Sequence, residues 1–431
     1  MRAFIICRKP ASILILLVAC LLSACTTTRP SEPAAAAKQS TELSLLVFGD
    51  HGYDLVDLEE KDRVPVRNWD QAVEYQRKKW ISEKRPPDEF QPPSLVVLPS
   101  TGGYVPATGI LLVADAMRSW CQHTRCDAAV MLGDNVYPNG PTGGADGVDD
   151  AVRFERIFRK PFGDFGSIAP DFRIYAVLGN HDWRTSREAA LGEVHYLETT
   201  KPFYMDGIRY RVQPPAADGD VEIFALDTEV LLGGTTVYDD ALADDGSELP
   251  PAKLDVPEPW TKPASEEERL MVEWLERSLR ESKARWKIVI GHHPLWSSAG
   301  SKFEDAKAMR RLILPTLCRY ADMYLAGHEH TLEVHTDDCS VALPGVKVQP
   351  LPQLVSGAAS KHRPVNSWFQ AHQIRKSPQL TSLYAKGIVW GFMYLTLRDD
   401  RAVVTVVTTP NDGSGGATAE YTKEFARRSG Q

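Results

Sequence analysis

The sequence predicts an α/β fold, in which two stacked mixed β-sheets are flanked by helices in a four-layer α+β sandwich. Short continuous apolar runs, typical of strands buried on both faces, alternate with helical patterns early and late in the chain. Hairpin patterns lie between and after these units. Five apolar runs stop at a glycine that is followed by Asp, Asn or His, so we expect these five loops to meet at one sheet edge.

The first half of the chain contains the first group of predicted elements. In order, they are a strand at 43–48, a helix at 110–120, a strand at 128–132, a helix around Phe154, and a strand at 173–178. Residues 54–106 are charged and rich in proline, so we interpret them as an insertion with one helix around Trp69 to Ile81.

The second half of the chain contains the remaining elements and a second insertion. They are antiparallel strands at 208–212 and 221–226, a strand at 286–290, a helix at 306–320, a strand at 323–326, and a hairpin of 387–397 with 402–408. Residues 232–264 are acidic and proline-rich, which predicts a surface loop, and Ser265 with Glu268 forms a helix capping box. These elements together predict one domain over 43–409, and we expect 410–431 to be a C-terminal tail.

The N-terminus resembles a bacterial lipoprotein signal peptide over residues 1–24. Three basic residues precede an apolar run that is short for a membrane span. The run ends in Leu22-Ser23-Ala24-Cys25, which resembles a lipobox with Cys25 as the lipidated residue; the alternative is ordinary cleavage, with no role for Cys25. Residues 25–42 have the composition of a flexible tether. We expect export and a lipid anchor, and Thr26 favours the outer membrane.

The net charge limits the kinds of partner that we expect, and the cysteines indicate disulfides. Removing residues 1–24 takes away three basic side chains and moves the formal net charge from -8 to -11, so we expect no nucleic-acid partner. We also expect a monomer. In an exported protein the four remaining cysteines suggest disulfides, with three possible pairings. A zinc knuckle is the alternative, but no Cys-x-x-Cys spacing occurs. These cysteines are Cys121, Cys126, Cys318 and Cys339.

The glycine-ended loops supply metal-binding side chains. One metal rarely needs seven protein ligands, whereas two metals that share a carboxylate use them naturally, and Asp134 is placed to bridge. Oxygen and imidazole donors suit hard and borderline divalent or trivalent metals. The seven candidates are Asp50, Asp134, Tyr137, Asn180, His292, His328 and His330.

These motifs resemble those of calcineurin-like metallophosphoesterases. They are Gly-Asp-x-Gly at 49–52, Gly-Asp-x-x-Tyr at 133–137, Gly-Asn-His-Asp at 179–182, Gly-His at 291–292 and Gly-His-x-His at 327–330. The tyrosine variant is similar to that of purple acid phosphatases, and the small branch that includes tartrate-resistant acid phosphatase fits best. The resemblance implies a metallophosphoesterase-like fold and an acid phosphatase that cleaves small phosphate monoesters by in-line attack of a metal-bound hydroxide.

The resemblance also implies how the two metals are held. Asp50, Asp134, Tyr137 and His330 would hold Fe(III), because a phenol needs a strongly charged cation to ionise at low pH. Asp134, Asn180, His292 and His328 would hold a second metal, which is Fe(II), Zn or Mn.

Residues beside the ligands have expected roles as well. By family likeness His181 would stabilise the transition state or protonate the leaving group, and the alternative is orientation through Asp182. We expect His51, Asn135, Asp182 and His293 to lie around the metals or in the substrate pocket, with the His51 ring pointing away from the metals.

Two alternative functions remain. One is a phosphodiesterase or nucleotide hydrolase on the same metals, and the other is a surface lipoprotein that binds metal or phosphate without turnover.

Overall fold

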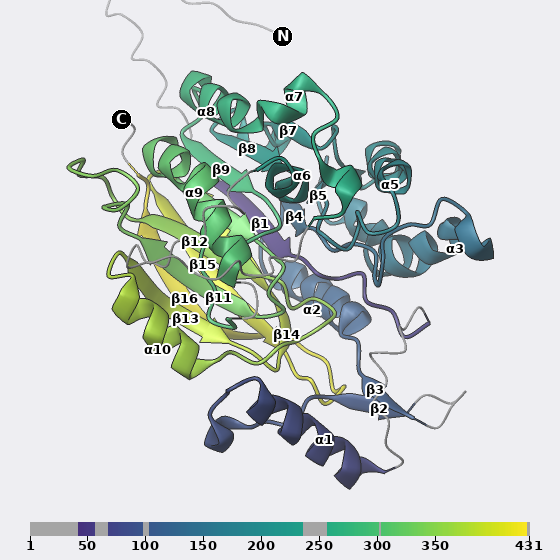
Figure 1. Ribbon diagram of the computed structural model, residues 1–431. Helices are drawn as coiled ribbons and strands as arrows, with labels where there is room; N and C mark the ends of the chain where they lie inside the picture. The colour runs from purple at the N-terminus through teal and green to yellow at the C-terminus, as the bar shows by residue number, and fades with distance from the viewer. Residues whose placement is uncertain (1–41, 57–67, 98–102, 236–256, 301–302, 429–431) are drawn as a thin grey trace, which may run out of the picture. The chain divides into compact units, whose positions relative to one another are not determined.

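The computed structural model describes residues 42–56, 68–97, 103–235, 257–300 and 303–428. Two seven-stranded mixed sheets and the helices around them confirm the predicted fold class (Figure 1). The expected signal peptide, the lipidated Cys25 and almost all of the tether lie outside the described residues, as do 57–67, 98–102 and 236–256 of the two insertions.

The first sheet has the strand order β16-β15-β14-β1-β4-β5-β6. Strands β1, β4, β5 and β6 are parallel, and β14 joins them as an antiparallel neighbour of β1. The bounds are β1 Glu42–Phe48, β4 Ala128–Leu132, β5 Ile174–Val177, β6 Phe203–Tyr204, β14 Trp390–Arg398, β15 Arg401–Thr409 and β16 Thr418–Ala426.

The second sheet has the order β13-β11-β12-β10-β9-β8-β7, with β8, β9, β10 and β12 parallel. Its bounds are β7 Arg209–Val212, β8 Val221–Leu226, β9 Trp286–Ile290, β10 Met323–Ala326, β11 Leu332–Asp337, β12 Leu351–Ser356 and β13 Leu380–Lys386. A small antiparallel pair, β2 Leu95–Val97 and β3 Tyr104–Pro106, belongs to the first insertion.

Helices cover the outer faces of the sheets, which explains why the central strands are continuous apolar runs. Every residue of β4, β5 and β10 is buried, α2 packs against β14 and β15, and α8 packs against β8 and α9. In order, the helices are α1 Trp69–Ser82, α2 Ile110–His123, α3 Asp150–Phe154, α4 Lys160–Phe162, α5 Arg187–Thr199, α6 Thr228–Gly233, α7 Glu266–Arg269, α8 Met271–Glu281, α9 Phe303–Tyr320 and α10 Ser367–Lys376.

Several local predictions can be checked directly. Helix α1 confirms the helix expected in the first insertion. The Ser265 hydroxyl accepts a hydrogen bond from the Glu268 backbone N–H, which is one half of the predicted capping box, while the Glu268 carboxylate accepts the backbone N–H of Ala264. The structure pairs Cys121 with Cys126 and Cys318 with Cys339.

The expectation of a tail at 410–431 is wrong, because β16 lies within it and pairs with β15 along its length. Side chains along β16 alternate between exposed and half-buried, so one face stays in solvent and the strand needs few apolar residues. Tyr421 and Phe425 are the only large apolar side chains in the strand and pack against the core from this edge. Such a sparse pattern does not stand out in the sequence.

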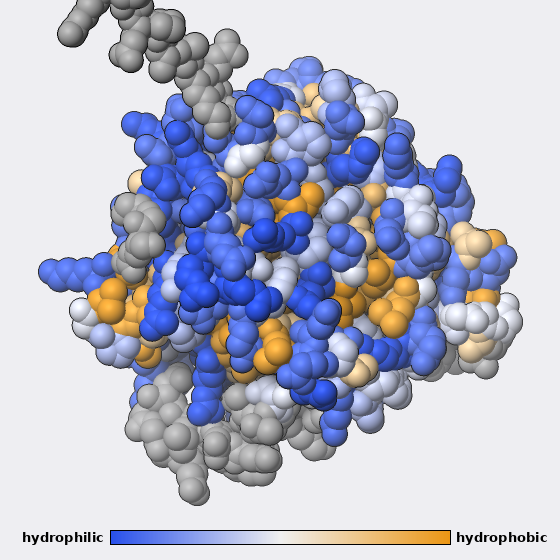
Figure 2. Space-filling view, turned by 90° about the horizontal axis from the view of Figure 1, so that it is seen from above, coloured by the Kyte–Doolittle hydropathy of each residue, from blue (hydrophilic) through white to orange (hydrophobic). Residues whose placement is uncertain are grey.

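The face of the molecule shown in Figure 2 gives little indication of an extended apolar contact. The face shown in Figure 2 is mostly hydrophilic, with apolar side chains in separate small patches. Among the described helices, none combines the length and hydropathy needed to cross a bilayer.

Candidate metal centre

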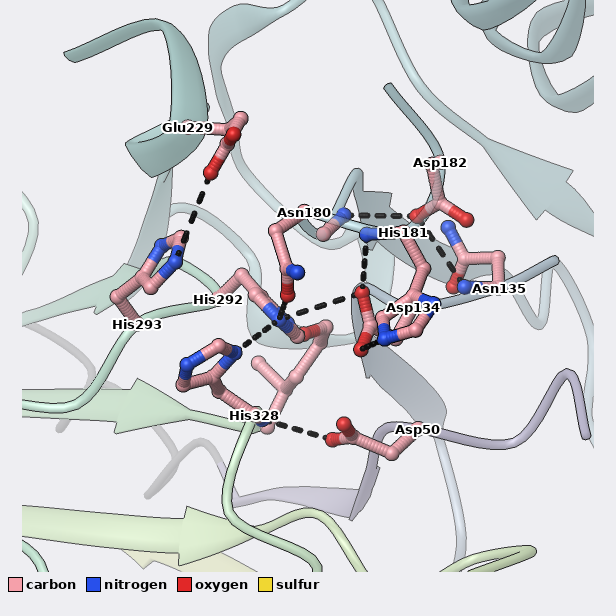
Figure 3. A network of polar contacts seen from close by, with 12 residues as sticks. Asp50, Asp134, Asn135, Asn180, His181, Asp182, Glu229, His292, His293 and His328 are labelled. Atoms are coloured by element: carbon pink, nitrogen blue, oxygen red, sulfur yellow. Dashed lines mark hydrogen bonds and ion pairs between the residues drawn. The ribbon is translucent and has the colours of Figure 1, made fainter. Parts of the chain in front are cut away.

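The predicted ligands come from the carboxyl ends of neighbouring parallel strands in both sheets. Asp50, Asp134 and Asn180 follow β1, β4 and β5 of the first sheet, while His292 and His328 follow β9 and β10 of the second. Because all these strands end at the same edge, the loops converge there, as the sequence predicted (Figure 3).

The backbone turns sharply at three of these positions. Asp50, Asp134 and His328 have φ angles of 56°, 52° and 70°, in the left-handed region that non-glycine residues rarely adopt. Such conformations cost roughly 1–3 kcal/mol each and persist only where the surrounding structure holds them. Here they bend the chain out of the strand so that the side chains point at one another.

The glycines before the ligands are required by close packing of the loops. A Cβ atom at Gly179 would lie 2.3 Å from both the backbone nitrogen and Oδ1 of Asp134. A Cβ atom at Gly327 would lie 2.6 Å from Oδ2 of Asp50. Each loop therefore leaves space for a ligand that comes from a different strand.

The first group of ligands surrounds the phenol of Tyr137. Its oxygen is 3.1 Å from Oδ1 of Asp50, 2.8 Å from Oδ2 of Asp134 and 3.0 Å from Nε2 of His330. His330 Nε2 is also 3.4 Å from Asp50 Oδ1. A phenol has one proton, which cannot satisfy both carboxylate oxygens at once.

The second group surrounds Nε2 of His292. This nitrogen is 3.2 Å from Asn180 Oδ1, 3.4 Å from Asp134 Oδ1 and 2.9 Å from Nδ1 of His328. The other ring nitrogen of His292 lies 2.8 Å from the carbonyl oxygen of Leu132, which is an acceptor only, so it carries the ring proton. The Nε2 lone pair is thereby directed at Asn180, Asp134 and His328.

Asp134 connects the two groups, because Oδ2 faces Tyr137 and Oδ1 faces His292. All seven ligand candidates are buried. Burial, and then the charge of Asp134, raises the pKa of Asp50 well above its usual value. Burial and the two carboxylates also raise the pKa of Tyr137. A buried set so rich in lone pairs and negative charge fits two metal cations that share one aspartate.

His181 lies beside the first group and is partly exposed. Its ring centre is 4.2 Å from that of Tyr137, and its backbone N–H donates to Asp134 Oδ1 at 2.9 Å. Its Nδ1 contacts the carbonyl oxygen of Pro138, so Nδ1 carries the proton in the neutral ring. Burial lowers the pKa of His181 to about 3, although Asp134 opposes this shift.

Asp182 and Asn135 lie behind the ligand loops. The Asp182 carboxylate accepts backbone N–H groups of Asn135, Val136 and Gly179 at 3.1, 2.8 and 2.7 Å, which ties the loops after β4 and β5 together. The Asn135 amide donates to the carbonyl oxygen of Val177 at 2.9 Å. Both side chains are fully buried and shape the ligand loops from behind.

The two remaining histidines have different surroundings. The His51 ring points away from the ligands and lies among Phe48, Phe158 and Phe162, with ring centres 5.3–5.7 Å apart. The His293 ring lies 4.4 Å from that of His328, next to the second group of ligands. Its Nδ1 is 2.8 Å from the Thr228 hydroxyl.

The structure also adds charged residues that the sequence analysis did not single out. Arg363 forms an ion pair with the buried Glu329, between the ligands His328 and His330. Lys361 places its Nζ atom 4.8 Å from the ring centre of Tyr137. Lys361 to Arg363 are three consecutive basic residues shortly after β12, a strand that the sequence analysis did not predict, and this run of basic residues is the signal that could have indicated them.

Comparisons with known proteins agree with this geometry. The family model for calcineurin-like phosphoesterase matches residues 110–332. Purple acid phosphatase 17 of Arabidopsis thaliana is 30% identical over 287 residues, which cover 65% of this chain and 71% of that protein. Tartrate-resistant acid phosphatase type 5 of Mus musculus is 28% identical over 224 residues, which cover 50% of this chain and 58% of the mouse protein.

Two solved structures share the fold. GAP50, described as the anchor in the inner membrane complex of Plasmodium, has a TM-score of 0.54 and 15% identity over 91% of this chain and 90% of its own. PhoD has a TM-score of 0.51 and 11% identity over 92% of this chain and 71% of its own. At these identities the likeness concerns the fold alone.

Proposed function

We propose that this chain, which belongs to the calcineurin-like phosphoesterase family and is of the purple acid phosphatase type, hydrolyses phosphate monoesters at a centre of two metal ions. The observation that carries the proposal is the arrangement of seven buried donors in two groups around Asp134, with one carboxylate oxygen toward each group. Two metals at such a centre activate water and stabilise the charge that develops on phosphorus oxygens.

The two groups suggest different metals. Tyr137, Asp50, Asp134 and His330 would hold Fe(III), because burial and two carboxylates raise the pKa of the phenol and only a strongly charged cation ionises it. Asp134, Asn180, His292 and His328 would hold Fe(II), Zn or Mn, which accept imidazole and amide oxygen.

His181 would act on the substrate from the partly exposed side of the centre. Its Nδ1 proton is held by Pro138, so Nε2 is the atom left to contact a phosphate oxygen. A phosphate dianion beside Nε2 favours the imidazolium form, which can then pass its proton to the leaving alkoxide. Proton transfer of this kind contributes typically about 10²- to 10⁴-fold.

An assay with p-nitrophenyl phosphate and bis-p-nitrophenyl phosphate between about pH 4 and 8 tests the proposal, with metal content measured on the same samples. We expect the monoester to be hydrolysed faster. A preference for the diester would replace the monoesterase with a phosphodiesterase or nucleotide hydrolase. Absence of turnover in metal-loaded protein would leave a surface lipoprotein that binds metal or phosphate.

Export and lipid anchoring complete the proposal and rest on the sequence around Cys25. Mass spectrometry of the N-terminal peptide from membranes tests them. We expect a lipid-modified Cys25 and release of the protein into the soluble fraction by Cys25→Ser. An unmodified cysteine at this position would contradict the anchor.

A further inference from the structure

A cavity of about 550 Å³ opens beside the metal centre, and the metal-ligand candidate His330 is part of its wall. Two other regions supply most of the wall: the insertion, with Lys79, Trp80 and Phe90, and the segment 361–366. Pockets of roughly 300–1,000 Å³ are typical of sites for small organic molecules. A substrate whose phosphate lies on the metals therefore has room here for its organic part.

Hydrogen bonds connect the insertion to the other wall of the cavity, the segment 361–366. The buried Arg85 donates to the carbonyl oxygens of Pro364 and Val365 at 2.9 and 3.1 Å, and it pairs with Glu83 at 3.0 Å. Near the other end of this contact, the Ser367 hydroxyl donates to Glu89 at 2.7 Å. These bonds hold the two walls of the cavity together and thereby fix its shape.

The cavity is basic although the chain as a whole is acidic. Lys79 and Lys361 both line it, and among the lining residues that the structure describes the only acid is Glu83, which pairs with Arg85. Lys361 lies toward the metals, with its Nζ atom near the ring of Tyr137, whereas Lys79 lies on α1. An anionic group in the cavity would thus meet positive charge beyond that of the metals.

His362 belongs to the wall of the cavity, but its ring nitrogens do not face the solvent. Within the described part of the chain, both of its ring nitrogens are shielded from solvent without a hydrogen-bond partner. Burial lowers the pKa of His362 to about 4, so its ring is neutral and adds no charge to the cavity wall. The positive charge of the wall therefore comes from its lysine and arginine side chains.

We propose that this cavity binds the organic part of the substrate and selects phosphate monoesters that carry a second anionic group, such as a carboxylate or another phosphate. The inference rests on the proposed phosphatase function and adds its substrate class. The lining residues of the cavity come mainly from two regions, which Figure 1 locates by α1 and by the segment that leads into α10.

A matched pair of substrates tests the selection. 4-(Carboxymethyl)phenyl phosphate and 4-methylphenyl phosphate differ in one carboxylate, which a methylene group insulates from the phenol. We expect the wild type to prefer the charged substrate by kcat/KM, and Lys79→Gln to lower this preference about fivefold, as expected for losing one partly exposed ion pair. Lys78→Gln is the control, because Lys78 is the next residue on α1 and does not line the cavity.

A second measurement separates the cavity from catalysis. Calorimetry with 4-hydroxyphenylacetate and 4-methylphenol reports binding of the organic part alone. Weaker binding of 4-hydroxyphenylacetate to Lys79→Gln than to Lys78→Gln supports the inference. This holds even if neither phosphate is hydrolysed, because the absence of hydrolysis contradicts only the phosphatase function. Equal binding of both phenols, or hydrolysis with the same preference in both variants, overturns the inference and leaves the phosphatase function intact.

Discussion

Replacing Gly179 by alanine should disrupt the metal centre although no ligand residue is itself replaced. The new Cβ atom would lie 2.3 Å from the backbone nitrogen and Oδ1 of Asp134, and 2.8 Å from Cε1 of His292. Ordinary contacts of this kind begin near 3.4 Å, so one of the two loops must move by about 1 Å. The backbone nitrogen of Asp134 cannot rotate away, and the displacement therefore reaches the bridging carboxylate.

The expected loss can be estimated from this displacement. Overpacking costs typically about 1–3 kcal/mol of stability, and a shift of about 1 Å in catalytic geometry can cost about 10²-fold in rate. We expect Gly179→Ala to lose at least this much kcat/KM on p-nitrophenyl phosphate and to bind less metal. Metal content after gel filtration, urea unfolding and steady-state kinetics measure the three effects.

Gly192→Ala is the matched control. Gly192 lies inside α5, where a Cβ atom would meet nothing within 4 Å, so the substitution should raise helix stability by about 0.5–1 kcal/mol and leave activity unchanged. If Gly179→Ala keeps the wild-type metal content and kcat/KM, the close packing between the loops after β4 and β5 does not position Asp134, and the reasoning fails.

Three further predictions concern colour, catalysis and stability. Tyr137→Phe should abolish a broad visible absorption band, whereas Tyr53→Phe, whose ring lies 6.3 Å from that of Tyr137, should keep it; a band in both variants would contradict the phenolate–iron assignment. His181→Asn should lower kcat by about 10²- to 10⁴-fold at unchanged metal content, and normal turnover by this variant would exclude proton transfer by His181. Burial raises the pKa of Asp322 to about 6, so the folded state holds this proton more tightly than the unfolded chain. Relative to Asp322→Asn, wild-type stability should therefore be highest below about pH 4 and fall by about 2–3 kcal/mol as the pH rises through 6. Parallel urea titrations at pH 4 and 7 measure this difference, and a constant difference would refute it.

The strands that lead into the ligand candidates, and the ligand types, were predictable because both depend on local patterns. A continuous apolar run reports a strand covered on both faces, and the glycine that follows, as at Gly133, marks a sharp turn before a polar side chain. The weak strand β16 was missed because one of its faces stays in solvent and leaves few apolar residues to detect.

The sequence by itself determined the fold class and the set of candidate ligands, because strand burial and donor chemistry are properties of short segments. Only the tertiary structure decided which atoms meet: that Asp134 turns one oxygen to each group, that Asp182 holds backbone amides, and that the His51 ring lies in an aromatic cluster. The cavity between the insertion and residues 361–366 was decided there as well. Its two walls are more than 250 residues apart in the chain, and contacts such as that of Arg85 with Pro364 form only when the whole chain packs.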